Sequence, residues 1–142
     1  MQKEIHQIKL EQAEGEYAIC RLSPNAVIPT WADDTGFVTI SRSEFELSIV
    51  CLAKRVPENI QKEDGWTCLR FVGPFAFGAT GIVLSVVRPL SEGGLGVFVV
   101  STFDGDHLLL KTGDMSKAAR LLGQAGHMLT LGGGADSSSQ PR

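Results

Sequence analysis

The stretch that decides the fold runs from residue 66 to residue 111 and reads WTCLRFVGPFAFGATGIVLSVVRPLSEGGLGVFVVSTFDGDHLLLK. It opens with a strand-like run that ends at Gly73-Pro74, because proline cannot donate to a sheet ladder. Thr80 to Leu90 then carries its apolar residues at helical spacing. Val97 to Phe103 is apolar on both faces, which is typical of a covered strand. The order strand, helix, strand predicts a β-α-β unit.

The residues that follow extend this unit. Asp104-Gly105 followed by an apolar run to Lys111 predicts a hairpin, in which glycine supplies a positive φ. Asp114 can cap a final helix that Gly126 ends. Within the first helix, Pro89 predicts a kink or a late end. The second half therefore reads β-α-β-β-α, and residues 131–142 read as a disordered tail.

The first half reads mostly as strands. Apolar runs bounded by turn residues predict strands at 5–11, 17–22, 36–40 and 45–51. In the last run Phe45, Leu47, Ile49 and Cys51 share one face. Ser41 to Glu44 has the spacing of a capped helical turn, and the polar segment 57–65 reads as a connection. We therefore expect a first lobe at 1–65 and a second lobe at 66–130.

Composition narrows the classes of partner. The chain has 142 residues, 43% of them hydrophobic, and a formal net charge of −3 without a Lys/Arg run, which disfavours nucleic acid. Its apolar runs are far shorter than the ~20 residues that span a bilayer, and its first residues lack a signal-peptide pattern. We expect no membrane association and a cytoplasmic location. Three widely spaced cysteines, Cys20, Cys51 and Cys68, read as reduced core residues.

The predicted β-α-β unit also places a candidate site. A right-handed crossover brings Thr80-Gly81-Ile82 to the sheet edge where Thr102-Phe103-Asp104 lies. Backbone N–H groups at a helix start attract a carboxylate, whereas Asp104 and Asp106 attract a cation. The two features together suit a zwitterion such as a free amino acid. The alternative is that Asp104 only forms the turn and that Asp106 is solvated.

Other chemistry has weaker support in the sequence. Ser101, Asp106 and His107 are the residue types of a nucleophilic triad, but they are neighbours on one hairpin and lack a Gly-x-Ser-x-Gly elbow. Asp104-Gly105-Asp106 lacks the remaining ligands of a calcium loop. The pair of glycines around Leu95 fails the dinucleotide fingerprint. We therefore expect no catalysis, no cofactor and no metal.

The second half resembles an ACT domain. The residues that carry the resemblance are GPFAFGATGIV at 73–83, Pro89-Leu90 and STFDGDHLLL at 101–110. Leu22, Ser23, Pro29, Trp31 and LSIVC at 47–51 resemble the shorter first lobe of tandem ACT proteins. The chain is similar to stand-alone bacterial tandem ACT proteins and to the ACT modules of aspartokinase and of the animal cytosolic arginine sensor. The resemblance implies an α+β, ferredoxin-like βαββαβ sandwich in two lobes, the first degenerate.

The resemblance also implies a function and a set of site residues. ACT domains bind amino acids and regulate enzymes without catalysing a reaction, and they are usually paired, so a homodimer and a regulated metabolic enzyme are the implied partners. By position, Gly81 and Ile82 bind the ligand carboxylate and Asp106 faces a cationic side chain. The pocket lining carried over is Gly96, Val97, Thr102 and Phe103. Arginine-sensing relatives have an acidic residue where this chain has Ala79, which favours a neutral amino acid or, alternatively, a ligand-free interaction module.

Overall fold

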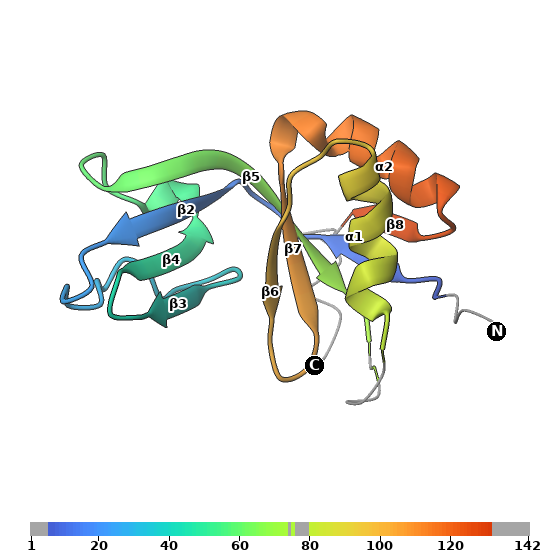
Figure 1. The fold of residues 1–142 in the computed structure, drawn as a ribbon. Coiled ribbons are helices and arrows are strands. Elements are labelled where there is room, and N and C mark those ends of the chain that lie inside the picture. The colour runs from blue at the N-terminus through green and yellow to red at the C-terminus, as the bar shows by residue number, and fades with distance from the viewer. Residues whose placement is uncertain (1–5, 74, 76–79, 132–142) are drawn as a thin grey trace. The chain divides into compact units, whose positions relative to one another are not determined.

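The computed structural model describes residues 6–73, 75 and 80–131, which form a mixed α+β chain (Figure 1). The contacts between these residues divide them into two compact units. One unit spans Gly15 to Thr67, and the other combines the residues up to Glu14 with those from Cys68 onward. Strand β5 (Gln61–Phe71) runs across the boundary, pairing with β2 in its first half and with β1 in its second.

The larger unit has the βαββαβ order of a ferredoxin-like fold. After the end of β5 come α1 (Ile82–Glu92), β6 (Phe98–Ser101), β7 (Asp106–Lys111), α2 (Met115–Gln124) and β8 (Met128–Leu131). The strand order is β6-β7-β5-β1-β8. Strand β1 (Lys9–Gln12) therefore lies between β5 and β8, antiparallel to the first and parallel to the second.

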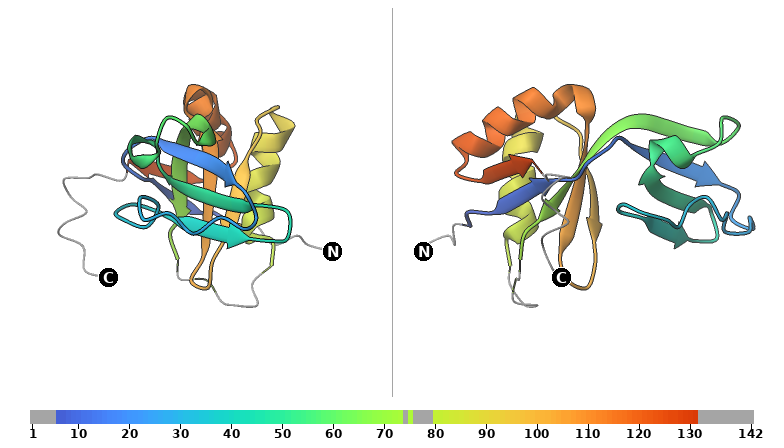
Figure 2. Two further views of the ribbon diagram at one scale, coloured as in Figure 1. Left: turned by 90° about the vertical axis from the view of Figure 1, so that its left-hand side faces the viewer. Right: turned by 180° about the vertical axis from the view of Figure 1, so that it is seen from behind.

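The two helices of this unit pack on one face of its sheet, as Figure 2 shows from two further sides. Alternate strand residues such as Leu10, Leu69 and Leu108 point to this face and are fully buried. They meet Val86 of α1 and Leu122 of α2, which are equally buried. Burial of such side chains contributes roughly 1.5–3 kcal/mol each, and this core fixes α1 against the sheet.

Unit 15–67 is built from strands, in the order β3-β4-β2-β5. Its strands besides β5 are β2 (Tyr17–Leu22), β3 (Thr39–Arg42) and β4 (Leu47–Leu52). Among the described residues of this unit the helical content is one 3-10 turn, Ala53–Arg55. The unit therefore matches the expectation of a degenerate first lobe. Its core contains Cys20 and Cys51.

All three cysteines are reduced and buried, as the sequence predicts. Burial raises the pKa of the Cys20 thiol to about 11 and that of the Cys68 thiol to about 12. A thiol with such a pKa carries almost no thiolate near neutral pH, so these cysteines act as small core residues.

Several predictions about the first half are wrong. Residues 61–65 are not a connection but the first part of β5, where Gln61 pairs with Arg21. Ser41 to Glu44 forms no helical turn, because β3 continues to Arg42 and the Ser43 hydroxyl accepts the backbone N–H groups of Phe45 and Glu46. Phe45 precedes β4 and is 73% exposed, so it does not share the buried face of that strand.

The first residues of the chain also differ from the predicted division. The sequence assigns residues 1–65 to the first lobe, whereas β1 pairs with the end of β5, with Leu10 opposite Phe71. The predicted second lobe ends with a helix, whereas β8 follows α2 and completes the sheet beside β1. The predicted tail lies outside the described residues except for Leu131, which ends β8.

The predicted helices and the β6-β7 hairpin are confirmed, but the prediction of a covered strand at Val97 to Phe103 is wrong. Strand β7, and not β6, pairs with β5, so β6 lies at the edge of the described sheet, and its Val99 is 38% exposed. Helix α1 continues through Pro89 and ends at Gly93, its C-cap. The β6-β7 hairpin also forms, but Gly105 does not have a positive φ. Its four-residue loop is closed instead by the Thr102 N–H, which donates to the Gly105 carbonyl at 2.7 Å. Asp114 takes the N-cap position of α2 without a side-chain hydrogen bond. Among the residues described, no helix has the length and apolar character needed to cross a membrane.

Candidate functional site

The start of α1 presents backbone donors that have no hydrogen-bond partner within the helix. Gly81 is the N-cap with φ 80°, a conformation that glycine adopts at little cost. The first bond of the helix runs from the Ser85 N–H to the Gly81 carbonyl at 2.9 Å. The N–H groups of residues 82–84 therefore precede the first helical bond, and no side chain among the described residues caps them. Such a helix start carries a partial positive charge.

This helix start borders a cavity of about 380 Å³ that lies within the larger unit. The cavity also reaches the loop between β6 and β7. Its lining within the described chain consists of Phe75, Gly81, Ile82, Val83, Leu84, Thr102, Phe103, Asp104, Gly105 and Asp106. The volume lies near the lower end of the range for small-molecule sites, about 300–1,000 Å³.

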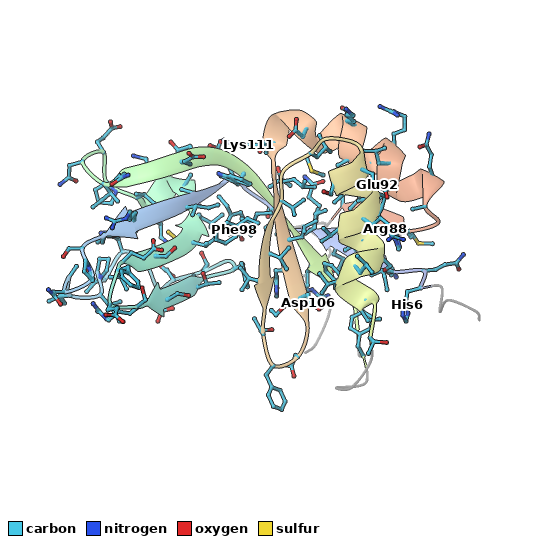
Figure 3. The ribbon with its side chains drawn as sticks, in the orientation of Figure 1. His6, Arg88, Glu92, Phe98, Asp106 and Lys111 are labelled. Carbon is cyan, nitrogen blue, oxygen red and sulfur yellow. The ribbon has the colours of Figure 1, made fainter. Side chains whose placement is uncertain are left out.

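Two carboxylates also line the cavity. Asp106, at the start of β7, is half-buried, and Asp104, in the loop, is exposed. The Ser101 hydroxyl donates to Asp106 Oδ1, which fixes the orientation of that carboxylate. Figure 3 shows Asp106 at the end of the unit where α1 begins. The cavity lining therefore combines the partial positive charge of a helix start with two negative charges.

The cavity brings six of the nine predicted site residues together. They are Gly81, Ile82, Thr102, Phe103, Asp104 and Asp106. The other three do not line it. Thr80 is exposed beside it, Gly96 is exposed in the loop before β6, and Val97 packs against the core. A ligand-binding role for all nine residues stays a prediction. Ala79, the expected departure from arginine-sensing relatives, lies outside the described residues.

Sequence reasoning missed other residues at this site. Leu84 lines the cavity and is 57% exposed, an unusual environment for leucine on a helix whose apolar stripe faces a core. His6 Nε2 lies 2.8 Å from the Thr80 carbonyl, directly beside the N-cap. No local sequence pattern indicates His6, because the pairing of β1 with β5, a long-range contact, brings it to α1.

Ser101, Asp106 and His107 do not form a nucleophilic triad in the structure. Ser101 and Asp106 face each other across the β6-β7 ladder, whereas His107, the next residue, points to the other face of the sheet. Burial, and secondarily the Arg70 guanidinium, lower the pKa of His107 to about 4, although Asp106 opposes this shift. Among the described residues no cluster of His, Cys, Asp or Glu is arranged to hold a metal ion.

The geometry agrees with the comparisons to known protein families. The ACT domain model matches residues 61–124, which contain β5, both helices and the β6-β7 hairpin. A separate model of an N-terminal domain matches residues 15–59, which lie within the smaller unit. No curated protein shows significant sequence similarity to the chain.

Solved structures extend this similarity. A protein from Agobacterium tumefaciens whose crystal structure is known is 55% identical in sequence to this chain. The match covers 90% of this chain and 96% of the other, with a TM-score of 0.87. Aspartate kinase from Clostridium acetobutylicum is 13% identical, with a TM-score of 0.59 over 87% of this chain and 36% of its own. A chain described as a C-terminal regulatory domain of aspartate kinase from Porphyromonas gingivalis is 15% identical, with a TM-score of 0.54 over 83% of this chain and 94% of its own.

The two aspartate kinase structures show the fold alone at these identities. The domain model and the βαββαβ topology agree with each other, and both identify the ACT fold. Residues 61–124 of the chain therefore belong to the ACT domain family.

Proposed function

We propose that this protein binds a free amino acid in the cavity between the start of α1 and the β6-β7 loop, and that it acts as a regulator without catalysing a reaction. One observation carries the proposal. The uncapped N–H groups of α1 and the carboxylates of Asp104 and Asp106 line the same cavity. An amino acid zwitterion has the complementary groups, a carboxylate and an ammonium, which are both bonded to its α-carbon.

The expected energies favour the carboxylate of Asp106 as the main determinant. A helix dipole at an exposed end contributes only about 0.3–1 kcal/mol to anion binding. A charge-assisted hydrogen bond between a carboxylate and an ammonium contributes about 1.5–3 kcal/mol. Asp106 is the stronger of the two candidates because it is half-buried and held by Ser101, whereas Asp104 is exposed.

The remaining lining suits the aliphatic part of such a ligand. Phe75, Ile82, Val83 and Leu84 supply apolar surface at the helix side. This lining favours a neutral amino acid over a cationic one. The sequence does so too, because it has alanine at residue 79, where arginine-sensing relatives have an acidic residue. The proposal therefore places the ligand carboxylate at the N–H groups of 82–84, its ammonium at Asp106, and its side chain against the apolar wall.

Calorimetry against each of the twenty amino acids tests the proposal. We expect heat of binding from a small set of neutral amino acids, and no heat from the matching amines that lack the carboxylate. For variants that remove the charge of Asp104 or Asp106, the control is Asp33→Asn. It removes the same charge from an exposed residue in the other unit. The absence of binding by any amino acid at millimolar concentration would contradict the proposal.

A second candidate function is an interaction module that docks on a metabolic enzyme without a ligand. The observation in its favour is that β6 pairs only with β7 among the described strands, so its other edge has no strand partner. An exposed edge can pair with a strand of another chain. Recovery of one metabolic enzyme on the immobilised protein, together with an empty amino-acid screen, would favour this function.

The same edge supports a homodimer. Phe103 and Leu84, which are 84% and 57% exposed, place apolar surface near the ends of β6 and α1. Light scattering of the purified protein decides between a dimer and a monomer.

Three reduced cysteines suit a cytoplasmic location, and fractionation of cells that express the protein tests that part of the proposal.

A further inference from the structure

The carbonyl of Ser85 has lost its usual partner within α1. In an α-helix this oxygen accepts the N–H of the residue four positions later, which here is Pro89. Proline has no N–H, so it leaves the Ser85 carbonyl without that bond. His127 fills the place, because its Nε2 lies 2.8 Å from the Ser85 oxygen. A residue between α2 and β8 therefore supplies the donor that α1 lacks.

The other ring nitrogen of His127 is also occupied. The backbone N–H of Ile8 donates to Nδ1 at 3.0 Å, and the Ile8 carbonyl accepts the N–H of Met128 at 3.0 Å. An Nδ1 that accepts an N–H carries no proton, so the proton of the neutral ring lies on Nε2 and points to Ser85. The side chain is buried, and His127 is only 7% exposed. The bond to Ile8 is therefore shielded from competing water, and the bond to Ser85 is partly shielded.

These contacts tie the first turn of α1 to the segment before β1 at two points. At one end His6 Nε2 contacts the Thr80 carbonyl at 2.8 Å. At the other end the chain of bonds runs from Ile8 through His127 to Ser85. The donors at residues 82–84, which border the cavity, lie between these two points. The position of the helix start therefore depends on the two contacts as well as on the core below it.

We propose that His127 is a positioning residue of the candidate site: it replaces the helical bond that Pro89 removes and so holds the donor-bearing first turn of α1 against the segment before β1. The part of the inference that concerns ligand affinity rests on the proposed function. The part that concerns the helix does not. Histidine suits this role because one rigid ring supplies a donor and an acceptor in opposite directions. An asparagine or glutamine side chain at this position can replace one nitrogen but not both.

The tautomer of His127 is the first test, and it requires no variant. Nitrogen-15 NMR of the full-length protein at neutral pH distinguishes protonated from unprotonated ring nitrogens. We expect an unprotonated Nδ1 and a protonated Nε2 whose hydrogen exchanges slowly with water. A proton on Nδ1, or a ring that averages between the two tautomers, would overturn the inference.

A double-mutant cycle is the second test. His127→Asn keeps an acceptor near Ile8 but removes the donor to Ser85, so we expect the α1 amides to exchange about tenfold faster in native-state hydrogen exchange. Pro89→Ala returns an N–H to the helix at the position that serves Ser85. In the Pro89→Ala background, the same asparagine substitution should therefore accelerate exchange by less than about threefold. Equal acceleration in both backgrounds would overturn the inference.

His127→Gln is the matched control. It keeps a donor toward Ser85 and removes the acceptor for Ile8, so Pro89→Ala should not rescue it. Amides of residues 15–67, which form a separate unit, report whether each variant is folded. If an asparagine variant does not fold, the tautomer measurement on the unmodified protein still decides the inference.

Ligand affinity separates this inference from the proposed function. With the amino acid that binds most tightly in calorimetry, we expect His127→Asn to weaken binding and Pro89→Ala to restore most of the loss. If no amino acid binds the unmodified protein, the proposed function fails, while the tautomer and the exchange cycle still decide whether His127 positions the helix.

Discussion

At the scale of single residues, Asp106 differs from Asp104 in environment and in predicted role. Both carboxylates line the cavity, but only Asp106 is half-buried and held by a neighbouring hydroxyl. The sequence could place both aspartates near the helix start, because crossover handedness decides that edge. It could not rank them, because the bond from Ser101 depends on the register of the hairpin, in which Ser101 lies opposite Asp106.

The variant Asp106→Asn tests the role of this charge. Asparagine keeps the acceptor for the Ser101 hydroxyl but removes the negative charge that faces the ligand ammonium. We expect more than tenfold weaker binding of the amino acid by calorimetry, with little change in stability. Asp104→Asn should weaken binding less, because Asp104 is exposed. Equal losses for the two variants would contradict the assigned difference.

His107 gives a prediction about pH. Its folded pKa of about 4 lies below the ordinary value of 6.5, mainly because of burial and secondarily because of Arg70. The unfolded chain therefore binds a proton first as the pH falls, and the stability contributed by the neutral ring is lost between about pH 6.5 and pH 4. Urea unfolding of the larger unit should show a weaker loss of stability over this range in His107→Gln. Identical pH profiles for the two proteins would show that His107 is not the cause.

At the scale of elements, α1 connects the fold to the site. The spacing of its apolar residues predicts the helix. Its last residue is Glu92, and Gly93 is the C-cap. The sequence predicts a kink at Pro89, but the consequence of this residue is a lost bond that His127 replaces. No local pattern predicts that contact, because 42 residues separate Ser85 from His127.

A glycine pair tests whether the start of α1 matters for binding. Gly81 and Gly94 have φ values of 80° and 87° and flank the helix at its two ends. A Cβ at either position has no contact shorter than 3.5 Å. Alanine at either position should therefore lower the stability only through its left-handed backbone conformation, by about 1–2 kcal/mol. We expect Gly81→Ala to weaken amino-acid binding in calorimetry, whereas Gly94→Ala should only lower the stability measured in urea. A similar loss of affinity in both would show that the helix start has no special role.

Strands were predicted less completely than helices, for two physical reasons. The first half of β5, with Lys62, Glu63 and Asp64, has the polar composition of a loop, and pairing with β2 overrides this local preference. Strand β8 has only four residues, too few for a clear alternation, and it forms because β1 offers an edge. Both strands depend on contacts between segments that are distant in sequence.

At the scale of the whole molecule, the site lies within one of two units. All the described residues that line the cavity belong to the larger unit, which contains most of the ACT domain match. Sequence reasoning could place most of this lining, because a β-α-β-β pattern has few possible topologies. It could not include His6 and His127, which reach α1 through β1 and β8 and have no sequence motif.

The most direct test of the central claim is an NMR titration of the full-length protein with each amino acid, followed through its backbone amides. The account predicts that the amides of residues 82–84 and of residues 102–106 shift together, with one dissociation constant, and that amides of residues 15–67 shift less. Shifts confined to other parts of the chain, or no shift with any of the twenty amino acids, would contradict it.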